Sequence, residues 1–423
     1  MTFQRADILL PVFSADSEKM QQWSVVACDQ YTSEPDYWQA VSEKTEGAYS
    51  TLNLTVPEIY LNDADIEERI AKTNAAMAQY MAEGIFKEYK NTYIFVERTL
   101  ASGVKRLGIV GMVDLEDYDY APDSQTKIRA TEGTVISRIP PRLKVRKDAS
   151  VELPHIMLLI DDASRSIIEP NVDRKSDFEK VYDFDLMQSS GHITGYKMSD
   201  DACEELDKKL AFLADLDAFN QKYGVSKESP LVFAMGDGNH SLATAKTNYE
   251  NLKKEIGVEA AKQSPARYAL CELVNLHDVS LEFEAIHRVI FEADGNAFLR
   301  ALEEKYQVSY AEDAIGQSFI FVQNGETKKV TVENPEEYLT VATVQKMLDA
   351  FTSEQGGEID YIHGEDVVLK LCEKPGNFGI ILEAMDKSDL YKSVILDGAL
   401  PRKTFSMGEA CDKRFYIEAR KIK

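Results

Sequence analysis

The sequence contains few cysteines, and it arranges none of them as a close pair. Its five cysteines are scattered over 423 residues without a Cys-x-x-Cys motif. Disulfide frameworks and zinc ribbons both depend on cysteines at characteristic spacings. A His-Glu-x-x-His motif is absent too. The sequence therefore predicts ordinary core thiols and no metal site.

Long hydrophobic runs are also missing. No apolar stretch approaches the roughly 20 residues that a membrane-spanning helix needs. The first residues, Met1 to Asp7, lack the basic and apolar regions of a signal peptide. We therefore expect no membrane partner and a cytoplasmic location. The length allows two or three domains with real cores.

Positive charge is scarce, since 48 Lys and Arg residues face 72 Asp and Glu residues, for a formal net charge of −24. A nucleic-acid partner would require a basic face that replaces phosphate counterions, so we expect none. A local cluster of arginines and backbone donors can still bind a small anion. A small anionic or phosphorylated metabolite is therefore the expected partner, and a homo-oligomer is compatible with the sequence.

The chain is organised around residues 236–241, Gly-Asp-Gly-Asn-His-Ser, which we call the elbow. It follows an apolar run that begins at Leu231, and apolar residues at helical spacing follow it from Leu242 onward. The pattern predicts a strand, a tight turn and a helix that begins close to Ser241. Free N–H groups at a helix N-terminus favour anions, and the glycines permit positive φ and close approach.

Several residues of the elbow are candidates for an anion site. A capped turn explains the same residues, with the Asp and Asn as helix caps and the His packed nearby. A Walker A loop is excluded because no Gly-Lys-Ser/Thr follows, and a full Gly-x-Gly-x-x-Gly is excluded because its third glycine position holds serine. The candidates are Gly236, Asp237, Gly238, Asn239, His240 and Ser241.

Residues 127–147 form a basic loop in an otherwise acidic chain. One interpretation is a solvated loop with incidental ion pairs. The other is an anion-facing segment, in which Arg138 and Arg142 are phosphate donors. In that case Glu132 is a base or a carboxylate that orients a metal.

The order of the predicted elements indicates an α+β fold with mixed sheets and several domains. We expect an N-terminal α+β region at 1–150, a central core with the elbow at 151–292, and a smaller C-terminal α+β unit with a docked tail at 293–423. Hairpins are expected around 101–103 and at Asn324-Gly325. One amphipathic helix is predicted from Ala202 to Tyr223.

Seven short segments resemble the domain of unknown function 1015 family, a bacterial and archaeal group. They are Leu52–Ile59, Gly108–Tyr118, Thr131–Thr134, Asp237–His240, Leu273–Asp278, His287-Arg288 and Leu400–Thr404. The family's elbow usually reads Asp-Gly-His-His-Arg. It is similar to that of free-serine kinases of the partition-protein/sulfiredoxin superfamily, where the elbow holds nucleotide phosphates at a helix N-terminus. The resemblance thus implies a sulfiredoxin-like core and, by gene context, a link to serine biosynthesis.

The elbow of this chain departs from that family pattern at two positions. Asp237, Gly238 and His240 match, but Asn239 replaces the first His and Ser241 replaces the Arg. Loss of the Arg removes a bidentate phosphate donor. Either another arginine such as Arg138, Arg142 or Arg402 substitutes for it, or the activity has changed or been lost.

The resemblance implies a nucleotide-dependent phosphotransferase that acts on a small hydroxylated metabolite, with ATP or ADP and Mg²⁺ as cofactors. Asp237 would help to hold Mg²⁺, Glu132 would accept the hydroxyl proton and His240 would donate to a phosphoryl oxygen. The candidate phosphate clamps are Arg138, Arg142, Arg288, Arg402 and Lys403.

Two other functions are considered. The first is a non-catalytic sensor that binds a phosphorylated metabolite in the same cleft, and the loss of the family Arg favours it. The second is a phosphate-ester hydrolase that uses Asp237 and His240, for which the sequence reveals no nucleophile with a paired base. His155 is interpreted as a hydrogen-bonded structural histidine.

Overall fold

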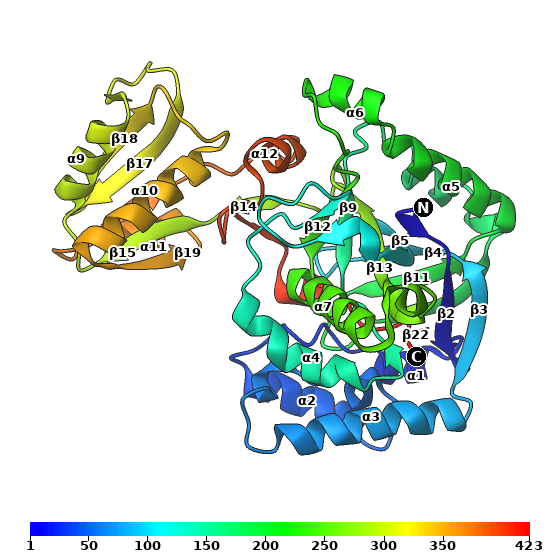
Figure 1. Cartoon of the computed structure of the whole chain (residues 1–423). Helices are drawn as coiled ribbons and strands as arrows, with labels where there is room; N and C mark the ends of the chain where they lie inside the picture. The colour runs from blue at the N-terminus through cyan, green and yellow to red at the C-terminus, as the bar shows by residue number, and fades with distance from the viewer. The chain divides into compact units, whose positions relative to one another are not determined.

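The computed structural model describes residues 1–423, which form two compact units. Unit 1 comprises residues 1–130, 134–281 and 408–423, and unit 2 comprises residues 131–133 and 282–407. Mixed sheets and twelve α-helices confirm the predicted α+β class (Figure 1).

The two units divide the chain differently from the three consecutive segments expected. One sheet of unit 1 crosses the expected boundary at residue 150, because strands from both sides of it pair with one another. The C-terminal tail, residues 408–423, belongs to unit 1. Aromatic burial explains the docking of this tail, since Phe415 and Tyr416 are almost fully buried in the core of unit 1.

Unit 1 is built on a ten-stranded mixed sheet in the order β10-β11-β4-β5-β13-β9-β12-β7-β6, with β1 paired to β5. Its strands are β1 (Phe3–Gln4), β4 (Ile94–Thr99), β5 (Lys105–Asp114), β6 (Tyr118–Asp119), β7 (Ile128–Arg129), β9 (Met157–Ile160), β10 (Glu179–Asp185), β11 (His192–Lys197), β12 (Phe233–Asp237) and β13 (Tyr268–Asn275). Two small sheets pair β2 (Ala6–Pro11) with β3 (Phe86–Thr92) and β8 (Val151–Glu152) with β22 (Arg420–Lys421).

Helices cover both faces of this sheet. They are α1 (Ser17–Trp23), α2 (Pro35–Thr45), α3 (Ile66–Ala82), α4 (Ile139–Lys147), α5 (Asp200–Leu213), α6 (Leu216–Tyr223), α7 (Asn239–Ile256) and α8 (Val258–Lys262). Side chains of β4 alternate between two cores, because successive residues of a strand point to opposite faces. Ile94 and Val96 join the core that contains α1 to α3, whereas Phe95 joins the core that contains α5 and α7.

The segment expected to form one helix from Ala202 to Tyr223 is instead two helices, so that prediction is wrong. Helix α5 ends at Leu213, and the carboxylate of Asp215 accepts a bond from Ala218 N at 2.8 Å to cap α6. Apolar residues continue at helical spacing across the break between α5 and α6. The sequence pattern therefore gave no sign that Asp215 caps a second helix. Both expected hairpins are confirmed, and Asn324 and Gly325 have the positive φ values of a tight hairpin turn.

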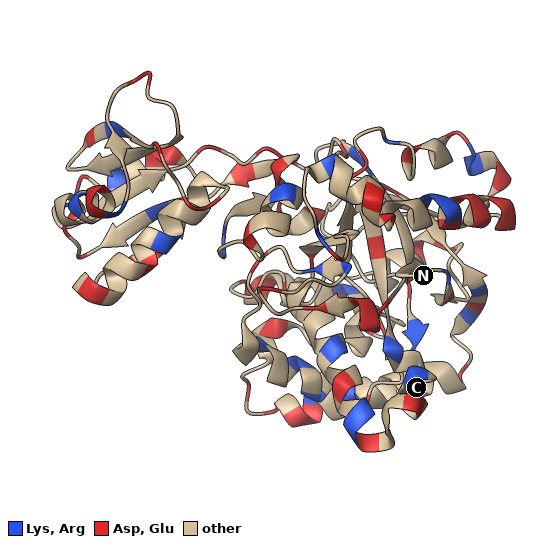
Figure 2. Cartoon of the chain, turned by 45° about the horizontal axis from the view of Figure 1, so that its top comes forward, with Lys and Arg blue, Asp and Glu red and all other residues tan.

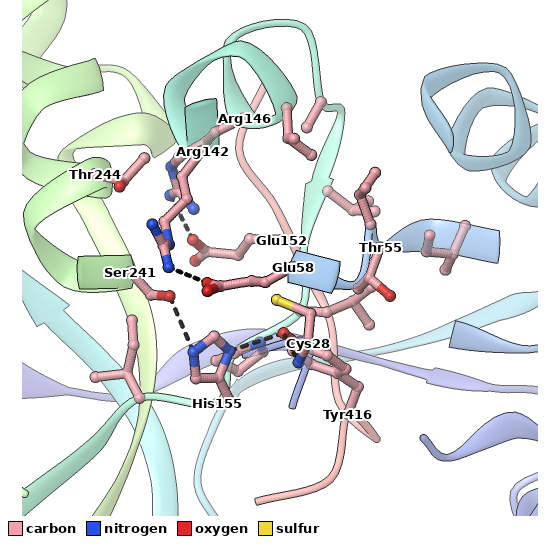
Figure 3. A pocket seen from close by; sticks show the side chains of 18 of the residues that line it. Cys28, Thr55, Glu58, Arg142, Arg146, Glu152, His155, Ser241, Thr244 and Tyr416 are labelled. Carbon is pink, nitrogen blue, oxygen red and sulfur yellow. Dashed lines mark hydrogen bonds and ion pairs between the residues drawn. The ribbon is translucent and has the colours of Figure 1, made fainter. Parts of the chain in front are cut away.

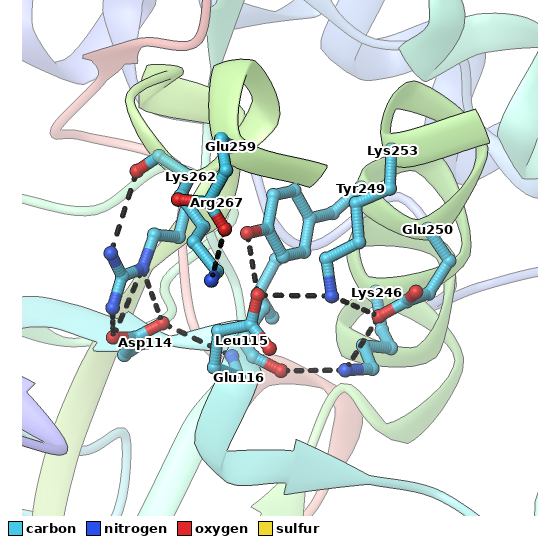
Figure 4. Close-up of polar contacts among 10 residues, drawn as sticks. All are labelled: Asp114, Leu115, Glu116, Lys246, Tyr249, Glu250, Lys253, Glu259, Lys262 and Arg267. Carbon is cyan, nitrogen blue, oxygen red and sulfur yellow. Dashed lines mark hydrogen bonds and ion pairs between the residues drawn. The ribbon is translucent and has the colours of Figure 1, made fainter. Parts of the chain in front are cut away.

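Helix α7 is fixed at its far end to residues that follow β5 (Figure 4). The hydroxyl of Tyr249 donates to Glu116 at 2.7 Å, and Nζ of Lys253 lies 2.9 Å from the same carboxylate. Nζ of Lys246 donates to the carbonyl of Leu115 at 2.9 Å. Together with the buried Leu242, these contacts anchor α7 within unit 1.

Unit 2 contains a six-stranded sheet in the order β16-β18-β17-β20-β15-β19 and a pair β14-β21. Its elements are β14 (Phe283–Ala285), β15 (His287–Phe291), α9 (Gly295–Lys305), β16 (Val308–Ser309), β17 (Gln317–Gln323), β18 (Glu326–Val332), α10 (Thr340–Gln355), β19 (Glu358–Ile362), α11 (Glu365–Leu371), β20 (Phe378–Ile381), α12 (Asp389–Asp397) and β21 (Phe405–Met407). Phe298, Phe351 and Phe378 pack together between helices and sheet.

Acidic and basic side chains are interspersed over the elements of each unit (Figure 2). None of the twelve α-helices combines the length and the apolar character that a bilayer crossing requires.

Candidate functional site

The elbow of unit 1 has the strand-turn-helix geometry that its sequence predicts. Strand β12 ends at Asp237, Gly238 adopts a left-handed φ of 79°, and α7 begins at Asn239 without a side-chain cap. The first backbone bond of the helix runs from Leu242 N to the carbonyl of Gly238 at 3.0 Å. The N–H groups of residues 239–241 therefore have no partner within the helix.

His240 lies in the first turn of α7 and is held as a neutral ring. Its Nε2 accepts the backbone N–H of Val135 at 3.3 Å. Burial lowers the pKa of His240 to about 4, with further contributions from the charges of Arg142 and Arg138. At neutral pH the ring carries no charge, and its proton lies on Nδ1, where it is available to a ligand.

Arg138 and Arg142 come from the turn before α4 and from α4 itself, which packs against α7. Arg142 donates to the carbonyl of Arg138 at 2.6 Å and forms an ion pair with Glu58. Burial raises the pKa of the Glu58 carboxyl, although the charge of Arg142 opposes that shift. The structure therefore brings Arg138, Arg142 and the elbow together.

Two aspartates flank a lysine from the docked tail. Lys413 Nζ lies 3.3 Å from a carboxylate oxygen of Asp237. Burial by itself would raise the pKa of Asp29, but the charges of His155 and Lys413 and a hydrogen bond from Gln30 hold it below its usual value. Asp29 is therefore an ionised carboxylate beside two cationic or cation-forming groups.

His155 connects the elbow to the tail (Figure 3). Its Nε2 lies 3.0 Å from Ser241 Oγ, and its Nδ1 lies 2.8 Å from the hydroxyl of Tyr416. A carboxylate oxygen of Asp29 lies 3.6 Å from the same Nε2. The ring is hydrogen-bonded, as the sequence predicted, and both of its partners belong to the candidate site.

A cavity of about 140 Å³ opens beside Ser241 and His155. Leu54, Val56 and Met77 form part of its apolar wall, and the Arg142–Glu58 pair stands at its polar end (Figure 3). The cavity therefore offers a small molecule an apolar surface next to hydroxyl, imidazole and ionic groups.

Other elbow residues have defined surroundings. Gly236 lies so close to β9 that an added Cβ would be 3.0 Å from Leu159 Cγ. The side-chain oxygen of Asn239 is buried and has no hydrogen-bond partner. An unpartnered buried oxygen next to free helix N–H groups is a polar atom that a ligand or water would satisfy.

The remaining predicted residues, Glu132, Arg288, Arg402 and Lys403, belong to unit 2. Burial raises the pKa of Glu132 to about 7, against the opposing charge of Lys403 and a backbone hydrogen bond from Thr404. Arg288 is fully buried and donates to Gln345 at 3.0 Å, to the carbonyl of Lys403 at 3.0 Å and to the carbonyl of Ile286. Each nitrogen of its guanidinium therefore donates at least one hydrogen bond within unit 2.

No group of three or more His, Cys, Asp or Glu side chains is placed to hold a metal ion. Mg²⁺ often binds through one or two carboxylates and the phosphates of a nucleotide. At the elbow Asp237 offers one such carboxylate: one oxygen accepts the N–H of Gly238 at 2.8 Å, and the other lies 3.3 Å from Nζ of Lys413.

Sequence reasoning missed Asp29, Glu58, His155, Lys413 and Tyr416 as site residues. Lys413 and Tyr416 lie in the tail. The aromatic residues of the tail predicted that it docks, but not where on the protein it docks. His155 precedes β9, and the pairing of β9 with β12 brings it to the elbow. Glu58 lies in a segment that resembles the family, which was the one available signal for it.

Comparisons with known proteins give one family and several remote structural likenesses. Residues 9–351 match the family described as "Protein of unknown function (DUF1015)". No match was found among curated proteins.

Three solved structures illustrate the likenesses. A free serine kinase variant in complex with ADP is 11% identical, with 74% of this chain and 91% of that chain covered and a TM-score of 0.40. A conserved hypothetical protein from Pyrococcus furiosus is 12% identical, with coverages of 74% and 94% and a TM-score of 0.35. C-terminally truncated SbnI from Staphylococcus aureus is 9% identical, with coverages of 73% and 82% and a TM-score of 0.36. Because the family match spans most of the chain, this protein belongs to the domain of unknown function 1015 family, as its motifs predicted.

Proposed function

We propose that the elbow binds the phosphates of a nucleotide and that the protein transfers a phosphoryl group to a small hydroxylated metabolite. One observation carries the proposal. Beside an uncapped helix N-terminus, Arg138 and Arg142 lie close enough to His240 for their charges to lower its pKa, in a chain whose net charge is −24. Such a concentration of donors and positive charge matches a phosphate ligand.

Each donor of the elbow has a role in this proposal. The N–H groups of Asn239, His240 and Ser241 cradle a phosphate, and Gly236 and Gly238 allow its close approach. The Nδ1–H of His240 donates to a phosphoryl oxygen without adding a charge that Arg142 and Arg138 would repel.

Arg142 is the substitute for the arginine that the family elbow usually carries. Its guanidinium reaches the cavity next to Ser241 from α4, a different element (Figure 3). Glu58 holds it in place through an ion pair. The planar fork of an arginine suits a phosphate better than a serine hydroxyl does.

Asp237 would hold a Mg²⁺ ion that enters with the nucleotide, and such an ion neutralises charge on the transferred phosphoryl group. Asp29, ionised and close to His155, is the candidate acceptor of the proton from the substrate hydroxyl. The charged residues of unit 2, Glu132, Arg288, Arg402 and Lys403, are not needed for this proposal.

Calorimetric titration of the full chain with ATP or ADP in the presence of Mg²⁺ tests the first half of the proposal. We expect binding by the wild type and a loss of about 10- to 100-fold in affinity for Arg138→Gln and Arg142→Gln, since a hydrogen bond to a charged group contributes about 1.5–3 kcal/mol. Arg174→Gln is the matched control, because Arg174 pairs with Glu205 on the surface.

Incubation with nucleotide, Mg²⁺ and serine, followed by mass spectrometry for a phosphorylated product, tests the second half. Product formation supports the phosphotransferase. Binding without turnover of any hydroxylated amino acid would identify the alternative function, a non-catalytic sensor. Absence of nucleotide binding by the wild type would overturn the proposal.

A further inference from the structure

We propose that Ser241 is a nucleophile that takes up the phosphoryl group before the acceptor receives it; this inference rests on the proposed function. Ser241 occupies the position of the family Arg, and its Oγ lies 3.0 Å from Nε2 of His155. It stands in the same first turn of α7 as the N–H groups assigned to phosphate. A hydroxyl with a paired base is the arrangement that the sequence alone did not reveal.

The surroundings of His155 orient it as a base. The ring is only 6% exposed, and its Nδ1 lies 2.8 Å from the hydroxyl of Tyr416. The Tyr416 oxygen also accepts the backbone N–H of Cys28 at 3.2 Å, so the phenol is held in turn. With the ring proton on Nδ1 and directed at Tyr416, the lone pair of Nε2 faces Ser241.

The carboxylate of Asp29 supplies a negative charge next to His155, which stabilises the ring when it becomes protonated. Its carboxylate oxygen lies 3.6 Å from Nε2 of His155. When Nε2 takes a proton the ring becomes a cation, and an ionised carboxylate at this distance stabilises it. Nucleophile, base and carboxylate thus meet in unit 1.

Other nucleophilic groups of the cavity are less suited. Thr244 lies one turn further along α7, but its hydroxyl donates to the carbonyl of His240 at 2.7 Å and has no base. Burial raises the pKa of the Cys28 thiol well above its usual value, so this group stays protonated. Of these groups, Ser241 is therefore the one whose hydroxyl has a base within hydrogen-bond distance and can act as the nucleophile.

The first step is balanced as follows. Ser241 Oγ attacks the terminal phosphorus of the nucleotide and an Oγ–P bond forms. The P–O bond to the leaving nucleotide breaks, and the leaving phosphate oxygen keeps the electron pair. The hydroxyl proton of Ser241 moves to Nε2 of His155. Arg142 and the free N–H groups of the helix offset charge on the transferred group.

The second step returns the enzyme to its starting state. The acceptor hydroxyl attacks the phosphorus and gives its proton to Asp29, which later releases it to water. The Oγ–P bond breaks, and Nε2 of His155 returns its proton to Ser241 Oγ. The sum is transfer of one phosphoryl group from the nucleotide to the acceptor hydroxyl.

The experiment incubates the full chain with ATP labelled in its terminal phosphate, or ADP labelled likewise, and Mg²⁺, without an acceptor. We expect one phosphoryl group on the intact protein, located at Ser241 by fragmentation. Ser241→Ala should take up none while it still binds nucleotide. His155→Gln should slow uptake by about 100-fold or more, the usual contribution of a general base.

Thr247→Val is the matched control. It removes a hydroxyl of α7 that bonds to the carbonyl of Ala243 and contacts Tyr120, away from the elbow. Uptake should equal that of the wild type.

Several outcomes would overturn the inference. Label on another residue, or transfer to serine by Ser241→Ala at the wild-type rate, would refute the nucleophile and leave the phosphotransferase intact. A wild type that binds no nucleotide would overturn the proposed function and this inference together. If Ser241→Ala folds poorly, the rate of phosphoryl uptake by His155→Gln provides the test. A rate equal to that of the wild type would show that His155 is not the base and would refute the inference.

Discussion

The backbone N–H of Val135 donates to Nε2 of His240 at 3.3 Å. This bond joins the basic loop to the elbow and fixes which ring nitrogen of His240 carries the proton. Because burial, Arg142 and Arg138 keep the ring neutral, His240 adds a donor to the site without adding charge. The charged donors of the site therefore lie on α4, on the turn before it and on the tail, whereas its neutral donors lie on α7.

Arg142→Gln should raise the pKa of His240 from about 4 toward 6.5, because Arg142 is the larger of the two arginine contributions. Arg138→Gln should raise it less. NMR titration of the ring measures both shifts, and Arg174→Gln is the control. Unchanged values in both arginine variants would show that burial alone sets the pKa of His240.

The same shift has a consequence for stability. Between pH 6.5 and about 4, His240 is protonated in the unfolded state but stays neutral in the folded state. Its contribution therefore destabilises the fold progressively as the pH falls through that window. The difference in pH-dependent stability between the wild type and His240→Gln should change across this range and be constant above it.

The elbow was predictable from the sequence because its signals are local. A glycine turn after an apolar run and an apolar stripe at helical spacing specify strand, turn and helix without reference to the rest of the chain. The hairpin at Asn324-Gly325 was predictable for the same reason. Asp215 shows the limit of such reasoning, since one capping side chain divided a continuous stripe into two helices.

The partners of the elbow were not predictable, because strand pairing and tail docking bring them there. His155 precedes Ser241 by 86 residues and reaches it through the pairing of β9 with β12. Lys413 reaches Asp237 because the tail inserts Phe415 into the core of unit 1. Both contacts depend on how whole strands and the tail pack together, and no local sequence pattern predicts that packing.

Gly238→Ala should destabilise unit 1 and weaken nucleotide binding. The residue has a φ of +79°, and an added Cβ would lie 2.9 Å from the backbone Cα of Ile156. Left-handed geometry costs a non-glycine residue about 1–2 kcal/mol, and the backbone contact adds to that cost.

Gly224→Ala is the matched control for this prediction. Gly224 has a φ of +67° at the end of α6, with no atom near an added Cβ. Thermal unfolding of the two variants separates strain from steric contact. Equal losses would show that the backbone at Ile156 shifts to accommodate the methyl group.

Glu132→Gln should stabilise unit 2 at neutral and higher pH. Burial raises the pKa of this carboxyl from 4.5 to about 7. Between these values the folded state binds a proton that the unfolded state has lost, so stability falls as the pH rises through the window. Above pH 7 the full penalty is roughly 3 kcal/mol.

Amide hydrogen exchange in β15 and β20 reports the stability of unit 2 in both proteins. Gln keeps one acceptor oxygen for the backbone N–H groups of Lys403 and Thr404 and has no charge to bury. The two proteins should agree below pH 4.5 and diverge above it. A constant difference at every pH would mean that Glu132 is not the titrating group.

Arg414→Met should destabilise unit 1 by about 3–5 kcal/mol, because it leaves buried carboxylates without their cation. Arg414 is buried and forms ion pairs with Glu272 of β13 and with Glu418, which also accepts the hydroxyl of Tyr182 at 2.6 Å. Since Arg414 also anchors the tail, the variant should lower nucleotide affinity as well.

Denaturant unfolding and calorimetry measure the two effects of Arg414→Met. Lys423→Met is the control, because Lys423 pairs with Asp148 at 3.9 Å on the surface and such pairs contribute little. Adding Glu272→Gln and Glu418→Gln to Arg414→Met should recover part of the stability by removing the unpaired charges. If stability returns while nucleotide affinity stays low, the tail positions the site through Arg414 itself; if both return, the buried charges alone caused the loss.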